Sequence, residues 1–499
     1  MTHQTDAQSG SRKELAISKG WVQGVALVFI FGFTVMGILA ARTYSDGMPQ
    51  PTTVVDSTGQ TVYTTEDITS GQTIFLRRGL QQYGSVMGHG GYLGPDYTAE
   101  YLRLSSESVL AQLTDQGVQD PSVAVVEMMR TNRYDEATGV LVLTPEQVKA
   151  FDELKAHYAD VFGESSTKYG LIPNMITDPE EIHDITAFFG WTAWAAAAER
   201  PGLNYSYTNN WPGETRVDNH PTADILVWSA MSLVALLAGL GALFALYGRW
   251  SRQIGWHGSE IQSLSFLQPG AVKITPSQRV TAWFFLVVAV LFLIQATLGG
   301  AIEHYRADMA SFFGFDLARI LPFNLARTWH VQLSLLWTAA SFLAAGIFLT
   351  PIISGREPKR QNWLAIALLV ALVIVVAGTM VGTAVSTFGV EWAKGSIFFD
   401  QQWEYLDLPR FWQILLVIGL FLWIAIIYRG LRSRLSTESK FNMPWLFFYA
   451  GLAIPAFYAV GLLAGTETTL TVAEFWRFWV VHLWVEDFLE LFTTVMVAY

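Results

Sequence analysis

One apolar stretch near the C-terminus holds the residues best suited to metal or redox chemistry. Within residues 476–490, His482, Glu486 and Glu490 are spaced four apart, so on an α-helix they share one face. The stretch is otherwise apolar enough for a bilayer, where a charged side chain costs about 2.5–3.5 kcal/mol on insertion scales. A transition metal would offset that cost, and histidine with carboxylates suits iron.

Composition identifies the elements that must position these residues. Of 499 residues, 52% are hydrophobic, 14% aromatic and 15% charged, which indicates a membrane protein with aromatic belts. The net charge of −11 is concentrated in one region and argues against a nucleic-acid partner. The chain has no cysteine, which excludes disulfides, Fe–S clusters and a c-type heme attached through C-x-x-C-H.

Eight apolar runs are long enough to span a bilayer. They are residues 20–44, 222–248, 280–303, 323–352, 363–388, 408–429, 444–465 and 473–499. Basic residues gather before the first run, between the second and third, and after the fourth and sixth. These segments share one side if every run spans once, and that side is expected to be cytoplasmic. The first run is too long for a signal-peptide core and is interpreted as an uncleaved span.

This topology divides the chain into three parts. They are residues 1–44, a cytoplasmic N-terminus and first span; residues 45–221, an acidic, Gly-rich domain on the outer side; and residues 222–499, a bundle of seven spans. Within the outer domain, apolar periodicity predicts helices near 97–117 and 145–162, and a short strand pair over 54–65.

The topology also sets the depth of two histidines. His330 lies near the outer start of its run, about 9–12 Å below the outer face at 1.5 Å per residue. His482 lies eight residues beyond Glu474, about 12 Å below the same face by the same rise. A shared depth favours neighbouring metal centres, although a lone membrane histidine can also serve in a helix–helix hydrogen bond. Arg327, one turn above His330, could bind a heme propionate bidentately.

Two further polar groups lie at the outer boundary. His304 and Asp308 end the third run and could hydrogen-bond a quinol and accept its protons, or simply cap the helix. Glu404 and Asp407 precede the sixth run and could form a hard-cation site, belong to a proton path, or be solvated loop acids.

Three segments resemble a known family. The run Trp-Val-Val-His-Leu-Trp-Val-Glu ending at Glu486 is similar to the non-heme-iron helix of bacterial nitric oxide reductases, in the heme–copper oxidase superfamily. Arg-Thr-Trp-His, ending at His330, resembles their low-spin heme helix. An outer domain that carries Tyr-Thr-Asn-Asn-Trp-Pro but no C-x-x-C-H resembles the quinol-dependent type, whose cytochrome-c-like domain has lost its heme.

The resemblance implies a fold and a set of roles. The fold would be mainly α, a polytopic bundle of the heme–copper oxidase type with an extracytoplasmic cytochrome-c-like domain that lacks heme c. His330 would ligate heme b, with Arg327 beside it, and His482 and Glu486 would ligate the non-heme iron that pairs with heme b3. The remaining residues would serve as a proton-relaying acid (Glu490), as calcium ligands (Glu404 and Tyr92) and as the quinol site (His304 and Asp308).

The implied reaction is the reduction of two NO to N2O and water with quinol electrons, in the bacterial inner membrane, with a homodimer possible. Three departures from the family pattern favour an alternative, an NO dismutase on the same scaffold that forms N2 and O2. They are Asp487 where the family has Gly, Asp308 where it has Glu, and residues 399–402 in place of Gly-His-Gln-Gly.

The same resemblance places the other heme and iron ligands on later helices. We therefore expect the chain to be the N-terminal two-thirds of a longer protein, inactive by itself, with further C-terminal helices or a partner chain. A catalytically incomplete scaffold subunit is the third interpretation.

Overall fold

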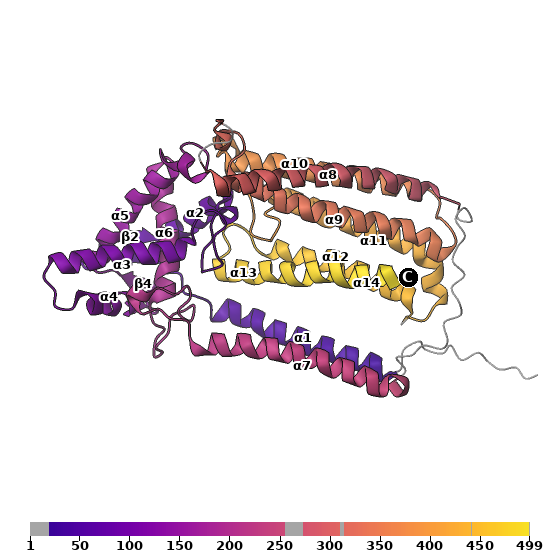
Figure 1. Ribbon diagram of the computed structural model, residues 1–499, viewed down its shortest axis with the longest axis horizontal. Coiled ribbons are helices and arrows are strands. Elements are labelled where there is room, and N and C mark those ends of the chain that lie inside the picture. Colours follow the sequence, from indigo (N-terminus) through magenta and orange to yellow (C-terminus); the bar gives the residue numbers. More distant parts are fainter. Residues whose placement is uncertain (1–18, 255–272, 310–313, 441, 499) are drawn as a thin grey trace, which may run out of the picture.

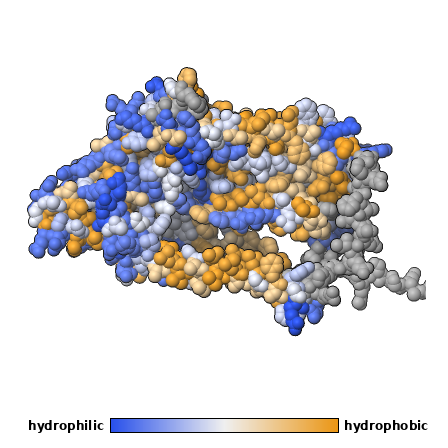
Figure 2. Space-filling view, in the orientation of Figure 1, coloured by the Kyte–Doolittle hydropathy of each residue, from blue (hydrophilic) through white to orange (hydrophobic). Residues whose placement is uncertain are grey.

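The computed structural model describes residues 19–254, 273–309, 314–440 and 442–498. Figure 1 shows a domain of short helices and strands at one end of a set of long helices. Figure 2 shows hydrophilic residues gathered over that domain and apolar residues over the long helices. The described part is mainly helical, as the sequence predicts.

The outer domain lies between the first two long helices in sequence. Its elements are β1 (Thr53–Val55), β2 (Thr61–Thr64), α2 (Thr65–Arg77), α3 (Tyr97–Asp115), α4 (Pro121–Arg130), β3 (Tyr134–Asp135), β4 (Val140–Val142), α5 (Pro145–Phe162) and α6 (Pro179–Ala197). The strands form one sheet in the order β2-β1-β4-β3, with β1 antiparallel to β2 and parallel to β4. Two predicted helices, as α3 and α5, and the predicted strand pair are confirmed.

Local sequence explains where the outer helices begin. Thr64 and Asp67 form a capping box at the start of α2, and the Asp96 carboxylate caps α3, each satisfying backbone N–H groups that a helix start leaves unpaired. The core between α2, α3 and α6 is aromatic, with Tyr97 stacked on Phe189 at 4.4 Å between ring centroids. These aromatic contacts form the core of the outer domain, which is continuous with the apolar core of the bundle.

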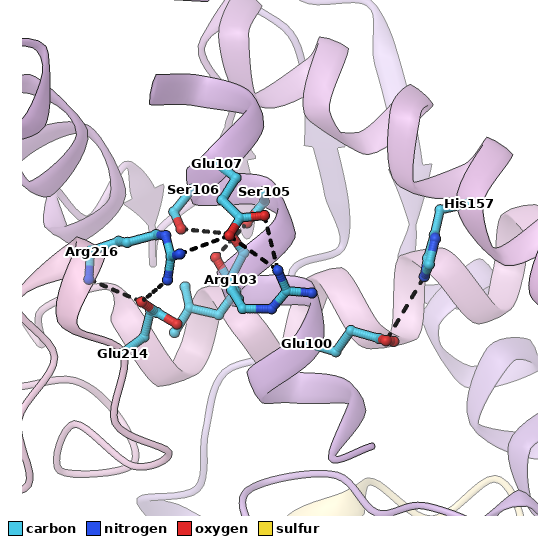
Figure 3. A network of polar contacts seen from close by, with 9 residues as sticks. Glu100, Arg103, Ser105, Ser106, Glu107, His157, Glu214 and Arg216 are labelled. Atoms are coloured by element: carbon cyan, nitrogen blue, oxygen red, sulfur yellow. Dashed lines mark hydrogen bonds and ion pairs between the residues drawn. The ribbon is translucent and has the colours of Figure 1, made fainter. Parts of the chain in front are cut away.

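A surface network holds the segment after α6 against α3. Figure 3 shows Arg216 between Glu107 of α3 and Glu214, at 2.8 and 3.1 Å. Arg103 pairs with the same Glu107 at 2.9 Å. These charge pairs, together with the fully buried Val217, fasten the return toward the membrane to the outer domain.

Seven helices among the described residues are long and apolar enough to cross a membrane. They are α1 (Lys19–Ser45), α7 (Ala223–Ile254), α8 (Pro276–Ala307), α9 (Phe323–Ser354), α10 (Gln361–Thr387), α11 (Arg410–Thr437) and α12 (Met443–Ala459), the last extended by a 3-10 turn to Leu463. They match seven of the eight predicted runs.

The eighth run differs from the regular helix that its apolar pattern predicts. It forms α13 (Leu470–Trp479), two π-helical stretches, Val480–Trp484 and Asp487–Phe492, and then α14 (Thr493–Ala498). Short π-helical segments interrupt α-helices often at functional sites. The residues singled out for metal chemistry lie in and between these stretches.

The bundle consists of α8 to α12 with the α13–α14 segment. Figure 1 draws α1 and α7 along one edge, apart from α8 to α11, and Figure 2 shows a hollow between that edge and the bundle. α1 contacts α13, where the Trp476 indole donates to the Tyr44 hydroxyl at 2.8 Å and Phe33 packs near Trp479. The first span thus contacts α13, the helix that leads to the segment with His482 and Glu486.

The outer domain is seated on the outer end of the bundle by buried polar contacts. The Gln72 amide donates to the carbonyls of Thr466 and Thr468, both at 2.8 Å. The carbonyl of Arg78 accepts from the Asn324 amide at 2.6 Å. Because the Gln72 and Asn324 side chains are buried, these bonds satisfy amide groups that water does not reach. The α2 helix and the residue that follows it are therefore held against the bundle.

Candidate cofactor and metal site

His330 lies on α9 and faces α8. Its Nδ1 is 2.9 Å from the backbone carbonyl of Gln295, and the Gln295 side-chain amide nitrogen lies 3.2 Å from Nδ1 and 3.0 Å from Nε2. A carbonyl can only accept, so Nδ1 carries the proton and Nε2 is left with its lone pair. Metal-bound histidines usually donate their other ring N–H to a carbonyl or carboxylate in this way, so the Nε2 atom of His330 would be available to a heme iron.

Arg327, one turn before His330, is engaged by the outer domain. Its guanidinium lies over the Tyr92 ring, 3.2 Å from the centroid, and donates to the Gln82 side chain. Gln82 in turn donates to Asp407 at 2.5 Å, and Asp407 pairs with Arg477 of α13 at 3.7 Å. One series of polar contacts therefore ties the outer ends of the two helices that lead to the candidate histidines.

These contacts bear on the depth of the two histidines. His330 lies three residues beyond Arg327 and His482 five residues beyond Arg477, roughly 4.5 and 7.5 Å deeper at 1.5 Å per residue. The helices also touch farther in, where Phe342 of α9 lies 5.9 Å from Phe488. The arrangement is consistent with histidines at similar depths on packed helices.

His482 follows the same hydrogen-bonding pattern as His330. Its Nδ1 is 2.9 Å from the Phe478 carbonyl and its ring stacks on Phe478 at 5.3 Å. The carbonyl again fixes the proton on Nδ1 and leaves Nε2 as the available ligand atom. His482, Glu486 and Glu490 are all exposed on the segment, so their side chains are accessible to further ligands.

The acids beyond His482 line a cavity of about 540 Å³ that opens between this segment and α1. Its lining includes Glu486, Asp487 and Glu490 together with Phe29 and Phe33 of α1. Asp487 is buried, and neither of its carboxylate oxygens has a hydrogen-bond partner among the described residues. An unpaired buried carboxylate is costly, which marks this position as a place for a cation or a proton.

The described residues do not contain a complete metal site, because no group of three or more His, Asp or Glu side chains lies close enough to hold an ion. His482 and Glu486 fit two ligands of an incomplete set. The π-helical turns also matter here, since an i→i+5 turn holds more residues than an α-turn. His482, Glu486 and Glu490 therefore shift progressively around the segment instead of lining one face, which the four-residue spacing did not indicate.

Glu404 and Tyr92 do not share a contact in the described structure. Glu404 is buried in the loop before α11, where its Oε1 accepts from the Leu408 N–H at 3.0 Å and from the Tyr458 hydroxyl at 3.4 Å. Burial, with nearby Asp407, raises the pKa of Glu404 to about 7. Its Oε2 is buried and has no hydrogen-bond partner among the described residues, and a calcium ion shared by Glu404 and Tyr92 stays a prediction.

His304 and Asp308 lie at the outer end of α8, as predicted. Asp308 is the C-terminal capping residue of α8, and its backbone N–H donates to the His304 carbonyl at 2.9 Å. The Asp308 side chain is exposed and His304 is half-buried. The pair is reachable from the membrane boundary, and its role in quinol binding stays a prediction.

Sequence reasoning missed two residues that organise the candidate site. Gln295 holds both ring nitrogens of His330, and Tyr458 joins Glu404 to Trp484, which lies 5.1 Å from the Tyr458 ring. Gln295 had a signal, because an isolated polar residue inside an apolar span often bonds to a neighbouring helix.

Comparison with known proteins agrees with this picture. Residues 51–213 match the NorB cytochrome c-like domain of nitric oxide reductase, and residues 279–499 match cytochrome c and quinol oxidase polypeptide I. A curated relative, the NorB component of nitric oxide reductase from Stutzerimonas stutzeri, is 28% identical over 228 residues, which cover 45% of this chain and 45% of the relative. The match thus spans less than half of that relative's length.

The fold and the matches define the class: a multi-pass membrane protein whose residues 279–499 form a domain of the heme–copper oxidase kind. Within that class, the chain joins a cytochrome c-like domain of the nitric oxide reductase kind to the oxidase bundle and is a distant homologue of NorB.

Proposed function

We propose that the protein is a membrane-bound nitric oxide reductase that uses quinol. The reaction is 2 NO + 2 e− + 2 H+ → N2O + H2O, with both electrons from oxidation of one quinol to quinone and two protons. The observation that best supports this proposal is a cytochrome c-like domain without any cysteine, joined in one chain to an oxidase bundle. Without a covalent heme in that domain, electrons are best supplied within the membrane.

His330, His482 and Glu486 are the residues that would hold the redox groups. His330 offers Nε2 to a heme b, and Arg327 lies one turn above it. His482 offers Nε2, and Glu486 its carboxylate, to a non-heme iron that pairs with heme b3. When bound, these groups supply electron transfer and the place where NO is reduced.

Protons and quinol need groups of their own. Glu490 lines the same cavity as Glu486 and is suited to deliver protons beside the iron ligand. His304 and Asp308, at the outer end of α8, can accept hydrogen bonds and protons from quinol hydroxyls.

NO dismutation, 2 NO → N2 + O2, is the second candidate function. The observation that favours it is Asp487, a buried carboxylate directly after the iron-ligating Glu486. An added negative charge beside the metal favours its oxidised state, and the reaction needs no electron donor. A reaction that needs no quinol would also not depend on which acid occupies position 308.

The assignment of the two histidines is tested by spectroscopy and iron analysis of the full-length protein. His330→Ala is expected to abolish the low-spin b-type heme signal. His482→Ala is expected to remove the non-heme iron and leave that signal intact. His220→Ala, an exposed outer-domain change, is the control and should match wild type. Loss of both groups in His482→Ala would mean that the metal helix is assigned wrongly, and a wild-type protein without b-type heme would refute the proposal.

A further inference from the structure

A loop of the outer domain brings His89 against α13. The Trp211 indole donates to the Gly88 carbonyl at 2.9 Å and anchors the loop just before the histidine. The His89 ring lies 6.1 Å from the Phe478 ring, measured between centroids, and its Nε2 is 3.7 Å from Oε2 of Glu474. Two polar side chains from distant parts of the sequence thus meet where the outer domain joins the bundle.

The hydrogen bonds around this pair leave two acceptor atoms facing each other. Nδ1 of His89 is 2.9 Å from the Val86 carbonyl, which can only accept, so Nδ1 carries a proton. The Trp403 indole N–H donates to Oε1 of Glu474, and Oε2 is the oxygen that faces His89. An imidazole lone pair and a carboxylate oxygen do not attract each other. A positive centre, either a proton or a metal ion, is needed between them.

The separation of the two atoms fits a metal ion better than a proton. A direct N–H···O bond spans about 2.7–3.2 Å, which is shorter than the 3.7 Å between His89 and Glu474. Two ligands bound tetrahedrally to one Zn2+, at about 2.0–2.1 Å each, lie about 3.4 Å apart, and a slightly wider angle reaches the observed distance. A ring N–H that donates to a carbonyl is also the usual arrangement of a metal-bound histidine.

A cavity of about 230 Å³ beside the pair supplies a third ligand and room for water. Gln81 lines it and is buried, and its Oε1 has no hydrogen-bond partner among the described residues. Arg477 also lines the cavity, but its charge is matched by Asp407 at 3.7 Å. Imidazole with a carboxylate favours Zn2+ over Ca2+, because calcium takes oxygen ligands alone.

We propose that His89 and Glu474 bind Zn2+ or a similar divalent cation, with Gln81 and water as the remaining ligands. The ion joins the outer domain to α13. His89 is exposed, so the ion exchanges with the solution on the outer side. The inference does not rest on the proposed reaction, and its ligands differ from those expected for iron (His482) and for calcium (Glu404).

The test uses full-length, tag-free protein from which a chelator has removed exchangeable metal, and measures Zn2+ binding by equilibrium dialysis. We expect one exchangeable Zn2+ per chain, with an imidazole nitrogen in its X-ray absorption spectrum. Loss of an outer-shell partner already costs about 10–100-fold in metal affinity, so His89→Ala and Glu474→Gln should each weaken binding by at least about 10-fold.

His183→Ala is the matched control and should leave zinc binding unchanged. His183 Nε2 also lies 3.7 Å from a carboxylate oxygen, Oδ2 of Asp67, but that oxygen already accepts the Thr64 N–H at 2.7 Å. His482→Ala separates the new site from the iron site: retained zinc binding supports the proposal, whereas its loss would mean that zinc only fills the iron position.

Three further results would overturn the proposal. They are wild-type protein that binds no exchangeable Zn2+, an unchanged affinity in His89→Ala, and displacement of the zinc by a modest excess of Ca2+, which would indicate ligation by oxygen alone. Because zinc binding is measured without NO or quinol, failure of the proposed reaction would leave these results unaffected.

Discussion

Arg77 and Glu181 form an ion pair with 2.6 Å between Nη2 and Oε1, and their side chains are only 9% and 12% exposed. Arg77 ends α2 and Glu181 lies in the first turn of α6. The same carboxylate is 2.9 Å from Lys394, in the loop between α10 and α11. One acid therefore joins two helices of the outer domain to the membrane bundle, and that junction holds the outer domain above the candidate site.

Glu181→Gln is expected to destabilise the outer domain substantially. Removal of one partner from a buried ion pair typically costs about 3–5 kcal/mol, because the remaining charges stay buried without compensation. Chemical unfolding in detergent would measure this. Glu107→Gln is the matched control, because Glu107 pairs with two arginines but is 37% exposed, and a surface pair contributes about 0–1 kcal/mol. Equal losses in both variants would contradict the role given to Glu181.

Stability should also depend on acid through Glu181. Burial raises the pKa of this carboxyl, but the hydrogen bond from Lys394 and the charges of Arg77 and Arg78 outweigh it, so its pKa lies below the ordinary value of 4.5. A depressed folded pKa means that ionised Glu181 stabilises the fold above pH 4.5, and that this contribution is lost as the pH falls through the lower folded value. Thermal unfolding between pH 7 and 3 should show a decline below about pH 4.5 that is smaller in Glu181→Gln. An identical decline in both proteins would exclude Glu181 as its cause.

Gly389→Ala should loosen the same junction from the bundle side. Gly389 has φ +65°, and a Cβ there would overlap the guanidinium of Arg78. Gly395→Ala isolates the backbone contribution, because Gly395 has φ +71° with no atom within 4 Å of the added Cβ. The left-handed conformation alone costs an L-residue roughly 1–2 kcal/mol. We expect a larger drop in unfolding temperature for Gly389→Ala, and equal drops would show that Arg78 simply moves aside.

Local patterns predicted much of the fold. Hydropathy located the long helices, although α7 and α11 continue six and eight residues beyond the predicted runs, and apolar periodicity located α3 and α5. Both predictions succeed because they depend on short-range patterns: a bilayer span needs a long apolar run, and a helix packed on one side needs apolar residues three and four apart. The π-helical stretches around His482 were not predicted, because no short-range rule distinguishes an i→i+5 turn from an α-turn in an apolar run.

The candidate site was only partly predictable for a related reason. His330 and His482 could be chosen because ionisable residues inside spans are rare. The contacts that orient them depend on pairs far apart in sequence, such as His330 with Gln295 and Arg477 with Asp407. Glu404 is a further example, because its carboxylate accepts from the Tyr458 hydroxyl, a residue on another helix that the local sequence does not indicate.

The proposed reaction is tested most directly by the gas that the full-length protein forms from isotopically labelled NO, analysed by mass spectrometry with and without a reduced quinol. A quinol-dependent reductase should give labelled N2O in the presence of quinol, none in its absence, and no product in His482→Ala. Release of labelled O2 with N2 in the absence of any donor would contradict the reductase assignment and identify the protein as a dismutase.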